Sequence, residues 1–274
     1  MKLAACLVSS DLTPLYLDFF PAVHRAWRQV VGVRAILVLV ADELPTSLEA
    51  FRSDIVLFPP MAGVHPAFQA QCLRLVAPQL LDTPRDEAVI ISDVDMLPMR
   101  RDYYVNPLLD AKPDEFVVYR SDAMPRSSQQ IIMCYSAAAP AVWGEMFGRA
   151  STTDEAATIV RRWNDNTHYS GSHGGEGWGT DQFLLFEGVE RLDPKRVRRL
   201  NDRQPRFARL DRGSIGTRLS PLQRSLTRRH FYSDYHMKRP NSEFAALNAE
   251  ILQLVSTGRP QPWPIDEILH RISR

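Results

Sequence analysis

The sequence predicts an α/β protein with a mixed, mainly parallel central sheet flanked by helices. In the first 120 residues, short apolar runs alternate with longer amphipathic stretches, which is typical of strands joined by crossover helices. The apolar runs are nearly continuous, as expected of strands buried on both faces of a sheet. The second half is expected to be irregular, because Gly- and His-rich or Arg-dense stretches interrupt its periodic segments.

The expected elements follow in chain order. In the first half, strands are expected at 3–8, 33–41, 54–60 and 88–92, and helices at 14–30 and 65–81. Pro21 should bend the first of these helices. In the second half, strands are expected at 116–120 and 130–136, and helices at 141–148, 154–164, 242–256 and 264–273. A further helix should follow Thr180, a favourable N-cap residue.

Composition limits the function. The chain has 274 residues, a length that suits one large domain or one and a half ordinary domains. Its net charge of +1 gives no global field for binding nucleic acid. Cys6, Cys72 and Cys134 lie in apolar segments, so we expect buried free thiols in a reducing compartment. The apolar run at the N-terminus is too short for a signal peptide, and no stretch reaches the roughly 18 apolar residues of a spanning helix. These features predict a cytoplasmic protein.

Two aspartates follow the expected strand at 88–92, in the run AVIISDVDMLPM. Residues i and i+2 of a strand face the same way, so Asp93 and Asp95 should project together from its carboxyl end. Ligands bind at that edge of open α/β sheets. Adjacent carboxylates repel unless positive charge lies between them, and we expect Mn²⁺ or Mg²⁺ there, with phosphate oxygens completing the shell. The alternative interpretation is a pair of solvated turn residues.

The run CLRLVAPQLLDTPRDEAVIISDVDMLPM resembles the donor-site block of the GT-A fold glycosyltransferases that include glycogenin and the bacterial lipopolysaccharide galactosyltransferases. The resemblance implies a GT-A (Rossmann-like) fold and a nucleoside-diphosphate sugar donor, with a UDP sugar favoured. It implies that Arg74 contacts the phosphate or ribose of the nucleotide. It also implies one domain, in which residues 1–120 form the nucleotide-sugar-binding half and residues 121–274 the acceptor-binding half.

Other stretches extend the resemblance. LAACLVSSD places a polar turn where such folds hold the nucleobase, and its candidates are Ser9, Ser10 and Asp11. QIIMCYSAAAPAVWGEM resembles the strand and helix that follow the sugar-binding loop in this family.

DYHMKRP resembles a late element of the family in which a histidine is the third protein ligand of the metal and a lysine meets the diphosphate. The resemblance implies these roles for His236 and Lys238, with His230 as the alternative ligand. The spacing between histidine and lysine is shorter here than is usual in the family.

The loop GEGWGTDQFLLFE contains candidates for binding the sugar and the acceptor. Its glycines let the backbone approach a ligand closely, and Trp178 offers a flat apolar face of the kind that stacks on sugars. GWGTDQ is similar to an element of inverting galactosyltransferases in which Asp is the catalytic base. TDQFLL is similar to an element of retaining enzymes that holds the donor sugar. Both resemblances place Asp181 at the reacting centre, beside Gly179 and Gln182. A capped helix after a flexible loop is the structural alternative.

The sequence therefore predicts a metal-dependent enzyme, a glycosyltransferase of the hexosyltransferase type, that moves a sugar from its donor to a glycan, glycolipid or other hydroxyl acceptor. Two alternatives stay open: a haloacid-dehalogenase-type phosphatase, whose nucleophile and acid also form Asp-x-Asp, and a sugar-nucleotide- or glycan-binding module without turnover. Residues 191–229 hold 13 basic residues against three acidic ones. An anionic acceptor, an anionic membrane surface or a lid over the diphosphate would each use such a segment, and we interpret it mainly as a solvated face with a few functional members, with peripheral contact to an anionic surface among its roles.

Overall fold

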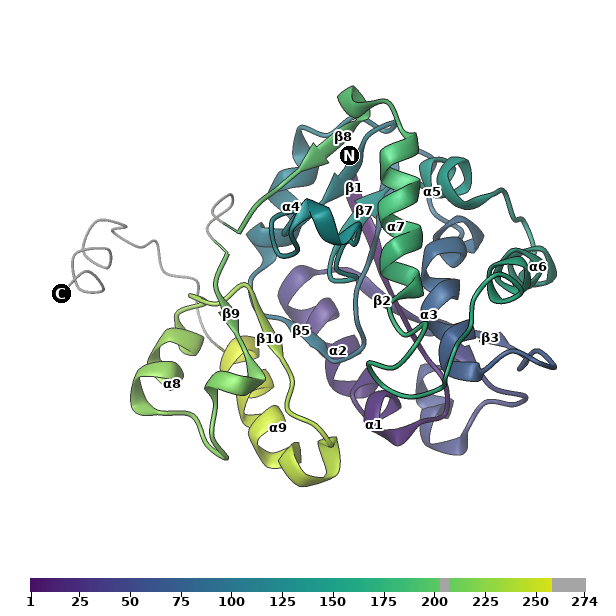
Figure 1. Cartoon of the computed structure of the whole chain (residues 1–274). Coiled ribbons are helices and arrows are strands. Elements are labelled where there is room, and N and C mark those ends of the chain that lie inside the picture. Colours follow the sequence, from purple (N-terminus) through teal and green to yellow (C-terminus); the bar gives the residue numbers. More distant parts are fainter. Residues whose placement is uncertain (203–206, 258–274) are drawn as a thin grey trace.

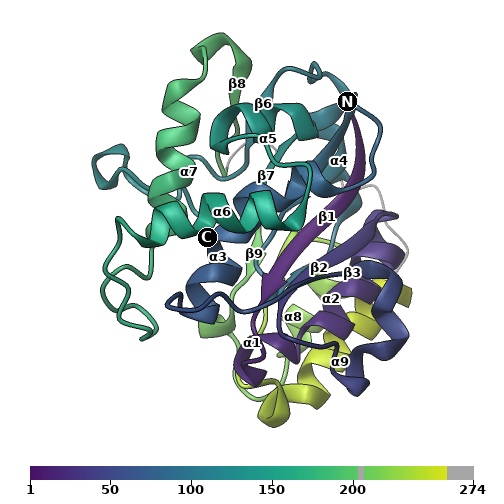
Figure 2. The same ribbon diagram turned by 90° about the vertical axis from the view of Figure 1, so that its right-hand side faces the viewer.

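A computed structural model describes residues 1–202 and 207–257 of the chain. A central sheet lies between two layers of helices, and a smaller sheet with two helices packs beside it (Figures 1 and 2). This is the α/β class that the sequence predicts. The helix expected at 264–273 lies outside the described residues.

Within the described residues the central sheet has seven strands in the order β3-β2-β1-β4-β7-β6-β8. Their bounds are β1 Lys2–Ser10, β2 Arg34–Val40, β3 Ile55–Phe58, β4 Glu87–Ile91, β6 Phe116–Val118, β7 Ser136–Ala138 and β8 Val197–Arg199. All neighbouring pairs are parallel except the two that β7 makes with β4 and β6. The sheet is therefore mixed and mainly parallel, as predicted.

The strand order reverses between β1 and β4. From β1 the chain adds β2 and β3 on one side, and then returns to place β4 on the other side of β1, with Cys6 opposite Ile90. Crossover connections leave β1 and β4 in opposite directions, which opens a crevice at their carboxyl ends where ligands bind in such sheets. Ser9–Asp11 and Asp93–Asp95 both stand at this edge.

Helices cover both faces of the central sheet. Their bounds are α1 Pro14–Leu17, α2 Phe20–Ala26, α3 Pro66–Val76, α4 Arg101–Leu109, α5 Pro140–Phe147, α6 Thr153–Asn164, α7 Thr180–Arg191, α8 Pro221–Arg228 and α9 Asn241–Thr257. Helices α3, α5, α6 and α7 form the layer on one face, and α2, α4 and α9 form the other layer (Figure 2). Along β1, Cys6 and Val8 join the core on the α2 side while Leu7 joins the core under α3. Two buried faces explain the continuous apolar runs.

The smaller sheet has the order β5-β10-β9, with β5 Met96–Pro98, β9 Arg209–Leu210 and β10 Asp234–His236. Strand β5 begins directly after Asp95, and β10 pairs with it antiparallel, so that His236 lies opposite Met96. The backbone N–H of Met237 also donates to the carbonyl of Asp95 at 2.9 Å. This pairing brings a late segment of the chain against the Asp-x-Asp stretch.

Some expected elements differ in the structure. The strand expected at 130–136 is found only at Ser136–Ala138, because the preceding residues run toward α7, where the N–H of Ile131 donates to Gln182 at 3.2 Å. The expected N-cap is also wrong: Gly179 is the N-cap of α7, and Thr180 is its first residue, with its hydroxyl donating to the Gly177 carbonyl at 2.6 Å.

The helix expected at 14–30 is divided into α1, α2 and a π-helical turn at Trp27–Val31, and Pro21 stands in the first turn of α2. All three cysteines are buried and unpaired, as predicted. Among the described residues, no helix combines the length and the apolar character needed to cross a membrane.

Candidate active site

A cavity of about 400 Å³ opens at the carboxyl ends of β1 and β4. Most of the residues singled out in the sequence line it: Ser9, Ser10, Asp11, Arg74, Asp93, Asp95, Trp178, Asp181, Gln182 and His236. Three candidates are not among its lining residues: Gly179, His230 and Lys238. Residues from both halves of the chain thus meet in one cavity.

Arg74 joins the Asp-x-Asp stretch to the start of α7, which follows the glycine-rich loop (residues 166–179). It lies in the last turn of α3 and is 6% exposed. Its guanidinium donates through Nη1 to Asp93 and through Nη2 to Asp181 Oδ2 at 2.8 Å. Burial works against its charge, but the two carboxylates outweigh burial and hold the pKa of Arg74 above its usual value. One buried cation therefore serves two carboxylates that are 88 positions apart in the sequence.

Asp181 is the more deeply buried of these two carboxylates, at 2% exposed. Burial raises the pKa of Asp181 from 3.8 to about 6, because loss of hydration and the negative charge of Asp93 together outweigh the attraction of Arg74. Its Oδ1 accepts a hydrogen bond from the N–H of Gln182 at 2.9 Å at the start of α7. Asp181 is thus held in one orientation and titrates near neutral pH.

This raised pKa predicts a pH-dependent stability. The folded protein binds the Asp181 proton more tightly than the unfolded chain does, so this contribution is complete below pH 4 and is lost as the pH rises through about 6. The loss should approach about 3 kcal/mol in the free energy of unfolding. The contribution of Asp181 is isolated by comparing the free energies of urea unfolding of wild type and Asp181→Asn at pH 4.0 and 7.5, because asparagine does not titrate. A difference between the two proteins that is the same at both pH values would contradict the assignment.

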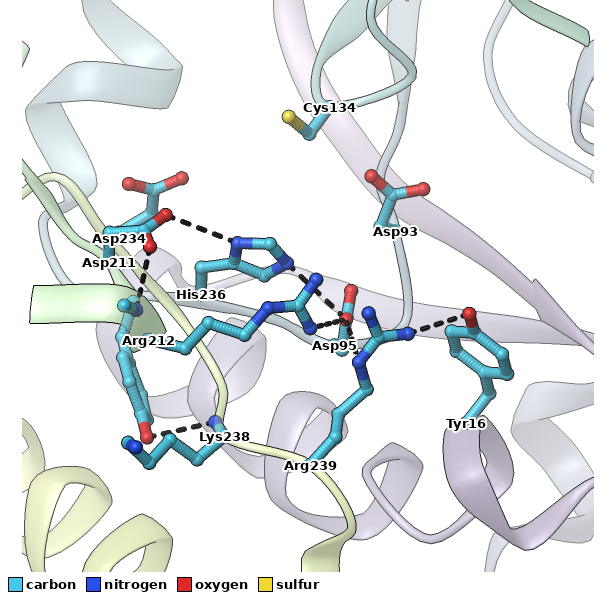
Figure 3. A network of polar contacts seen from close by, with 12 residues as sticks. Tyr16, Asp93, Asp95, Cys134, Asp211, Arg212, Asp234, His236, Lys238 and Arg239 are labelled. Carbon is cyan, nitrogen blue, oxygen red and sulfur yellow. Dashed lines mark hydrogen bonds and ion pairs between the residues drawn. The ribbon is translucent and has the colours of Figure 1, made fainter. Parts of the chain in front are cut away.

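Asp95 turns away from Asp93 into a separate group of side chains, the Asp95 cluster, which consists of Asp95, Asp211, Arg212, His236 and Arg239 (Figure 3). Asp95 is 5% exposed, and three side chains approach the same oxygen, Oδ2. Arg212 Nη1 lies at 3.1 Å, His236 Nε2 at 3.4 Å and Arg239 Nε at 3.7 Å. Burial opposes the charge of Asp95, but these neighbours prevail and lower its pKa.

The Asp95 cluster is built from three parts of the chain. His236 lies at the end of β10, and its Nδ1 is 3.3 Å from Asp211 Oδ2. Arg239 follows β10 and reaches back to α1, where its Nη1 donates to the hydroxyl of Tyr16 at 2.6 Å and its guanidinium lies 5.0 Å from the ring centroid. The contacts with Tyr16 fix the position of Arg239 at the cavity.

The residues expected to hold a metal do not form a three-ligand site. Asp95 and His236 are neighbours, but Asp93 is bonded to Arg74, and Oδ2 of Asp95 already faces two guanidinium groups. In the part of the chain that the structure describes, no group of three or more His, Cys, Asp or Glu side chains is arranged to bind a metal ion. The expected repulsion between Asp93 and Asp95 is relieved here by arginines.

Lys238 and His230 lie outside the cavity. The ammonium of Lys238 is 4.9 Å from the ring centroid of Phe244, and its backbone N–H donates to Tyr235. His230 directs Nδ1 to the carbonyl of Met99 at 2.9 Å. The structure instead places Arg239, the residue after Lys238, among the cavity-lining cations.

The rim of the cavity carries aromatic side chains from the glycine-rich loop. Trp178 stacks on Tyr169 with ring centroids 6.1 Å apart, and His173 lies 4.7 Å from Trp178. Gly177 has φ of +76°, and a Cβ there would lie 2.4 Å from the carbonyl oxygen of His168, so only glycine fits this turn. Of these three rings, Trp178 and His173 line the cavity, and Tyr169 packs against Trp178 from outside the lining.

Sequence reasoning missed several lining residues: Tyr16, Arg120, His173, Arg209, Arg212 and Arg239. The chain has 29 arginines, so the sequence alone does not show which of them line the cavity. Many arginines of residues 191–229 are ion-paired with acidic residues elsewhere, including Arg196 with Glu145, Arg198 with Glu115, Arg209 with Asp234 and Arg224 with Glu250. The Arg-dense segment is thus tied to its surroundings more than a solvated face would be.

No family model matches the chain, and no curated protein matches its sequence. Solved structures of glycosyltransferases are similar to it. GlyE of Streptococcus pneumoniae TIGR4 is 13% identical with a TM-score of 0.44, covering 76% of this chain and 47% of GlyE, so the chain spans about half of that protein's length. The galactosyltransferase LgtC, in complex with donor and acceptor sugar analogs, is 13% identical with a TM-score of 0.45, covering 94% of this chain and 97% of LgtC. Mouse xyloside xylosyltransferase 1 is 9% identical with a TM-score of 0.44, covering 86% of this chain and 98% of that one. All three of these proteins are glycosyltransferases.

Proposed function

We propose that this protein is a glycosyltransferase that moves a sugar from a nucleoside-diphosphate sugar, preferably a UDP sugar, to a hydroxyl of a glycan, glycolipid or similar acceptor. The observation that carries the proposal is the Arg74 bridge. It brings the Asp-x-Asp stretch and the glycine-rich loop, which resemble the donor block and the sugar-binding element of one enzyme family, into contact in one cavity.

The two halves of the chain take different parts in this proposal. In residues 1–120, Ser9, Ser10 and Asp11 at the end of β1 bind the nucleoside end of the donor, and Asp93 and Asp95 line the region of the diphosphate. Residues 121–274 supply the rest of the site. Trp178 and Gln182 lie near the transferred sugar or its acceptor, and Gly179 connects them as the N-cap of α7 without lining the cavity. The rings of Trp178 and His173 stack on a sugar face.

Asp181 is the proposed catalytic residue. Its carboxylate is buried, oriented by Arg74 and the N–H of Gln182, and ionised above a pKa of about 6. An ionised carboxylate there serves either as the base for an acceptor hydroxyl or as the group that orients the donor sugar. The anomeric configuration of the product distinguishes these roles, because inversion requires the base and retention the orienting group.

The family resemblance also implies Mn²⁺ or Mg²⁺ on Asp93, Asp95 and His236. When bound, such a cation neutralises the charge that develops on the leaving diphosphate. Asp93, Asp95 and His236 do not fit that ion, because arginines already pair with both carboxylates, so side chains of the protein neutralise the charge of the leaving diphosphate. Arg74, Arg212 and Arg239 place guanidinium groups along the cavity wall, where such groups stabilise a leaving anion.

We also propose that the protein acts in the cytoplasm, as three buried and unpaired cysteines suit a reducing compartment. Contact with an anionic surface through residues 191–229 stays a prediction. The ion pairs of this segment reduce the charge available for it.

A thermal-shift panel tests the donor. We expect UDP and UDP sugars to raise the unfolding midpoint by several degrees at about 100 times their dissociation constant, since ligand binding to the folded state alone stabilises it. GDP, CMP and their sugars, at equal concentration, are the matched controls and should shift it less. A larger shift with a GDP or CMP sugar would refute the choice of nucleotide, and no shift with any nucleotide sugar would refute the function.

A further inference from the structure

The Asp95 cluster places two guanidinium groups, those of Arg212 and Arg239, at the cavity where the donor's diphosphate would bind. Both guanidinium groups and an imidazole approach the carboxylate of Asp95, while the second carboxylate of the cluster, Asp211, faces the imidazole. Arg239 is additionally fixed by Tyr16. Among the residues that the structure describes, Asp95 is the only hydrogen-bonding partner of the Arg212 guanidinium. Further N–H groups of Arg212 can therefore bond to a ligand in the cavity, which both arginines line.

A divalent cation would meet an unfavourable environment at the same place. To bind Oδ2 of Asp95 it would have to displace Arg212, whose Nη1 lies at 3.1 Å, and remain close to Arg239 at 3.7 Å. Asp93, the expected second carboxylate, is bonded to the buried Arg74. Both carboxylates are thus already paired with arginines, and the like charge of these arginines repels an added metal ion.

We propose that guanidinium groups, and not a bound divalent cation, hold the donor's diphosphate in this cavity, with Arg212 and Arg239 donating hydrogen bonds to its oxygens. Planar guanidinium groups suit this task because they bind phosphate oxygens through paired N–H donors and are always charged. Asp95 and Tyr16 orient the two arginines in advance. This inference rests on the proposed function, since it concerns how the same site binds its donor.

Calorimetric titration of UDP into the full chain tests this directly, first with a chelator and then with added Mn²⁺. We expect the dissociation constant to change by less than about threefold between the two conditions, because arginines are the phosphate-binding groups. A larger loss of affinity in chelator that Mn²⁺ restores would overturn the inference and leave the proposed function standing. Absence of UDP binding in both conditions would overturn both.

Two variants test whether the Arg212 guanidinium binds the diphosphate. Arg212→Ala should weaken UDP binding in chelator by about tenfold or more, as expected for loss of a charge-assisted phosphate contact. Arg224→Ala is the matched control, because Arg224 is also paired with a carboxylate, Glu250, but lies outside the cavity. Equal UDP affinity in wild type and a folded Arg212→Ala, judged by circular dichroism, would overturn the role of the arginine.

Titration of Mn²⁺ alone gives an independent measurement. No saturable binding at concentrations up to about 1 mM is expected, since each carboxylate is already paired with a cation. One-to-one Mn²⁺ binding that Asp95→Asn abolishes would overturn the inference by showing that Asp95 is a metal ligand.

Discussion

Replacing Arg74 with alanine is expected to lower the free energy of unfolding by about 3–5 kcal/mol at pH 7, because it leaves buried charge without its partner. The Arg74 side chain is 7% exposed and that of Asp181 is 3% exposed, so water cannot replace the lost hydrogen bonds. The measurement is urea unfolding at equilibrium. Arg52→Ala is the control, because Arg52 forms its ion pair with Glu49 on the surface and should be replaceable with little effect.

A double variant tests whether the unpaired Asp181 carboxylate causes the loss of stability in Arg74→Ala. In Arg74→Ala, the Asp181 carboxylate is left buried and unpaired, so adding Asp181→Asn should recover a measurable part of the lost stability. Two results would show that Arg74 does not hold these two carboxylates in the folded protein. One is an Arg74→Ala variant as stable as wild type. The other is a double variant in which Asp181→Asn lowers the stability of Arg74→Ala as much as it lowers that of wild type.

Much of the first half could be predicted from the sequence. The continuous apolar runs at β1, β2 and β4 have a single physical explanation, burial on both faces. The order of the strands in the sheet is known only from the structure. The cavity edge was predictable, since Ser9–Asp11 and Asp93–Asp95 follow the two strands at the switch point. Local pattern and a general topological rule were sufficient there.

The structure of the second half depends on tertiary contacts that no local sequence pattern predicts. Strand β10 has three residues, and its place beside Asp95 is set by its pairing with β5. Strand β7 is shorter than the apolar run around it, because Ile131 is hydrogen-bonded toward α7. Short strands of this kind are determined by tertiary packing more than by the preferences of their own residues.

The charge balance of the site was the least predictable feature. From the sequence, Asp93 and Asp95 form a repelling pair that requires a cation. The structure supplies Arg74 from α3 to one carboxylate, and Arg212 and Arg239 from the second half to the other. No spacing in the sequence distinguishes these arginines from the other 26. Only the fold decides which cations reach the site.

The second large effect concerns Asp181, whose carboxylate points into the cavity beside Arg74. Asp181→Asn keeps the side chain's shape but removes the charge, so it is expected to lower turnover by a factor of about 10² or more. UDP affinity should stay within about threefold of wild type, since the residue acts on the sugar or the acceptor and not on the nucleotide. Gln182→Ala is a useful comparison, because Gln182 lies next to Asp181 and lines the same cavity without a titratable group.

The central claim, sugar transfer at this cavity, is tested most directly by the release of UDP from UDP sugars, followed with wild type and Asp181→Asn in parallel. The wild-type chain should release UDP, faster when a hydroxyl acceptor is present, and Asp181→Asn should bind UDP but release it at about 1% of that rate or less. Equal rates in the two proteins would contradict the account, and so would wild-type release of inorganic phosphate in place of UDP.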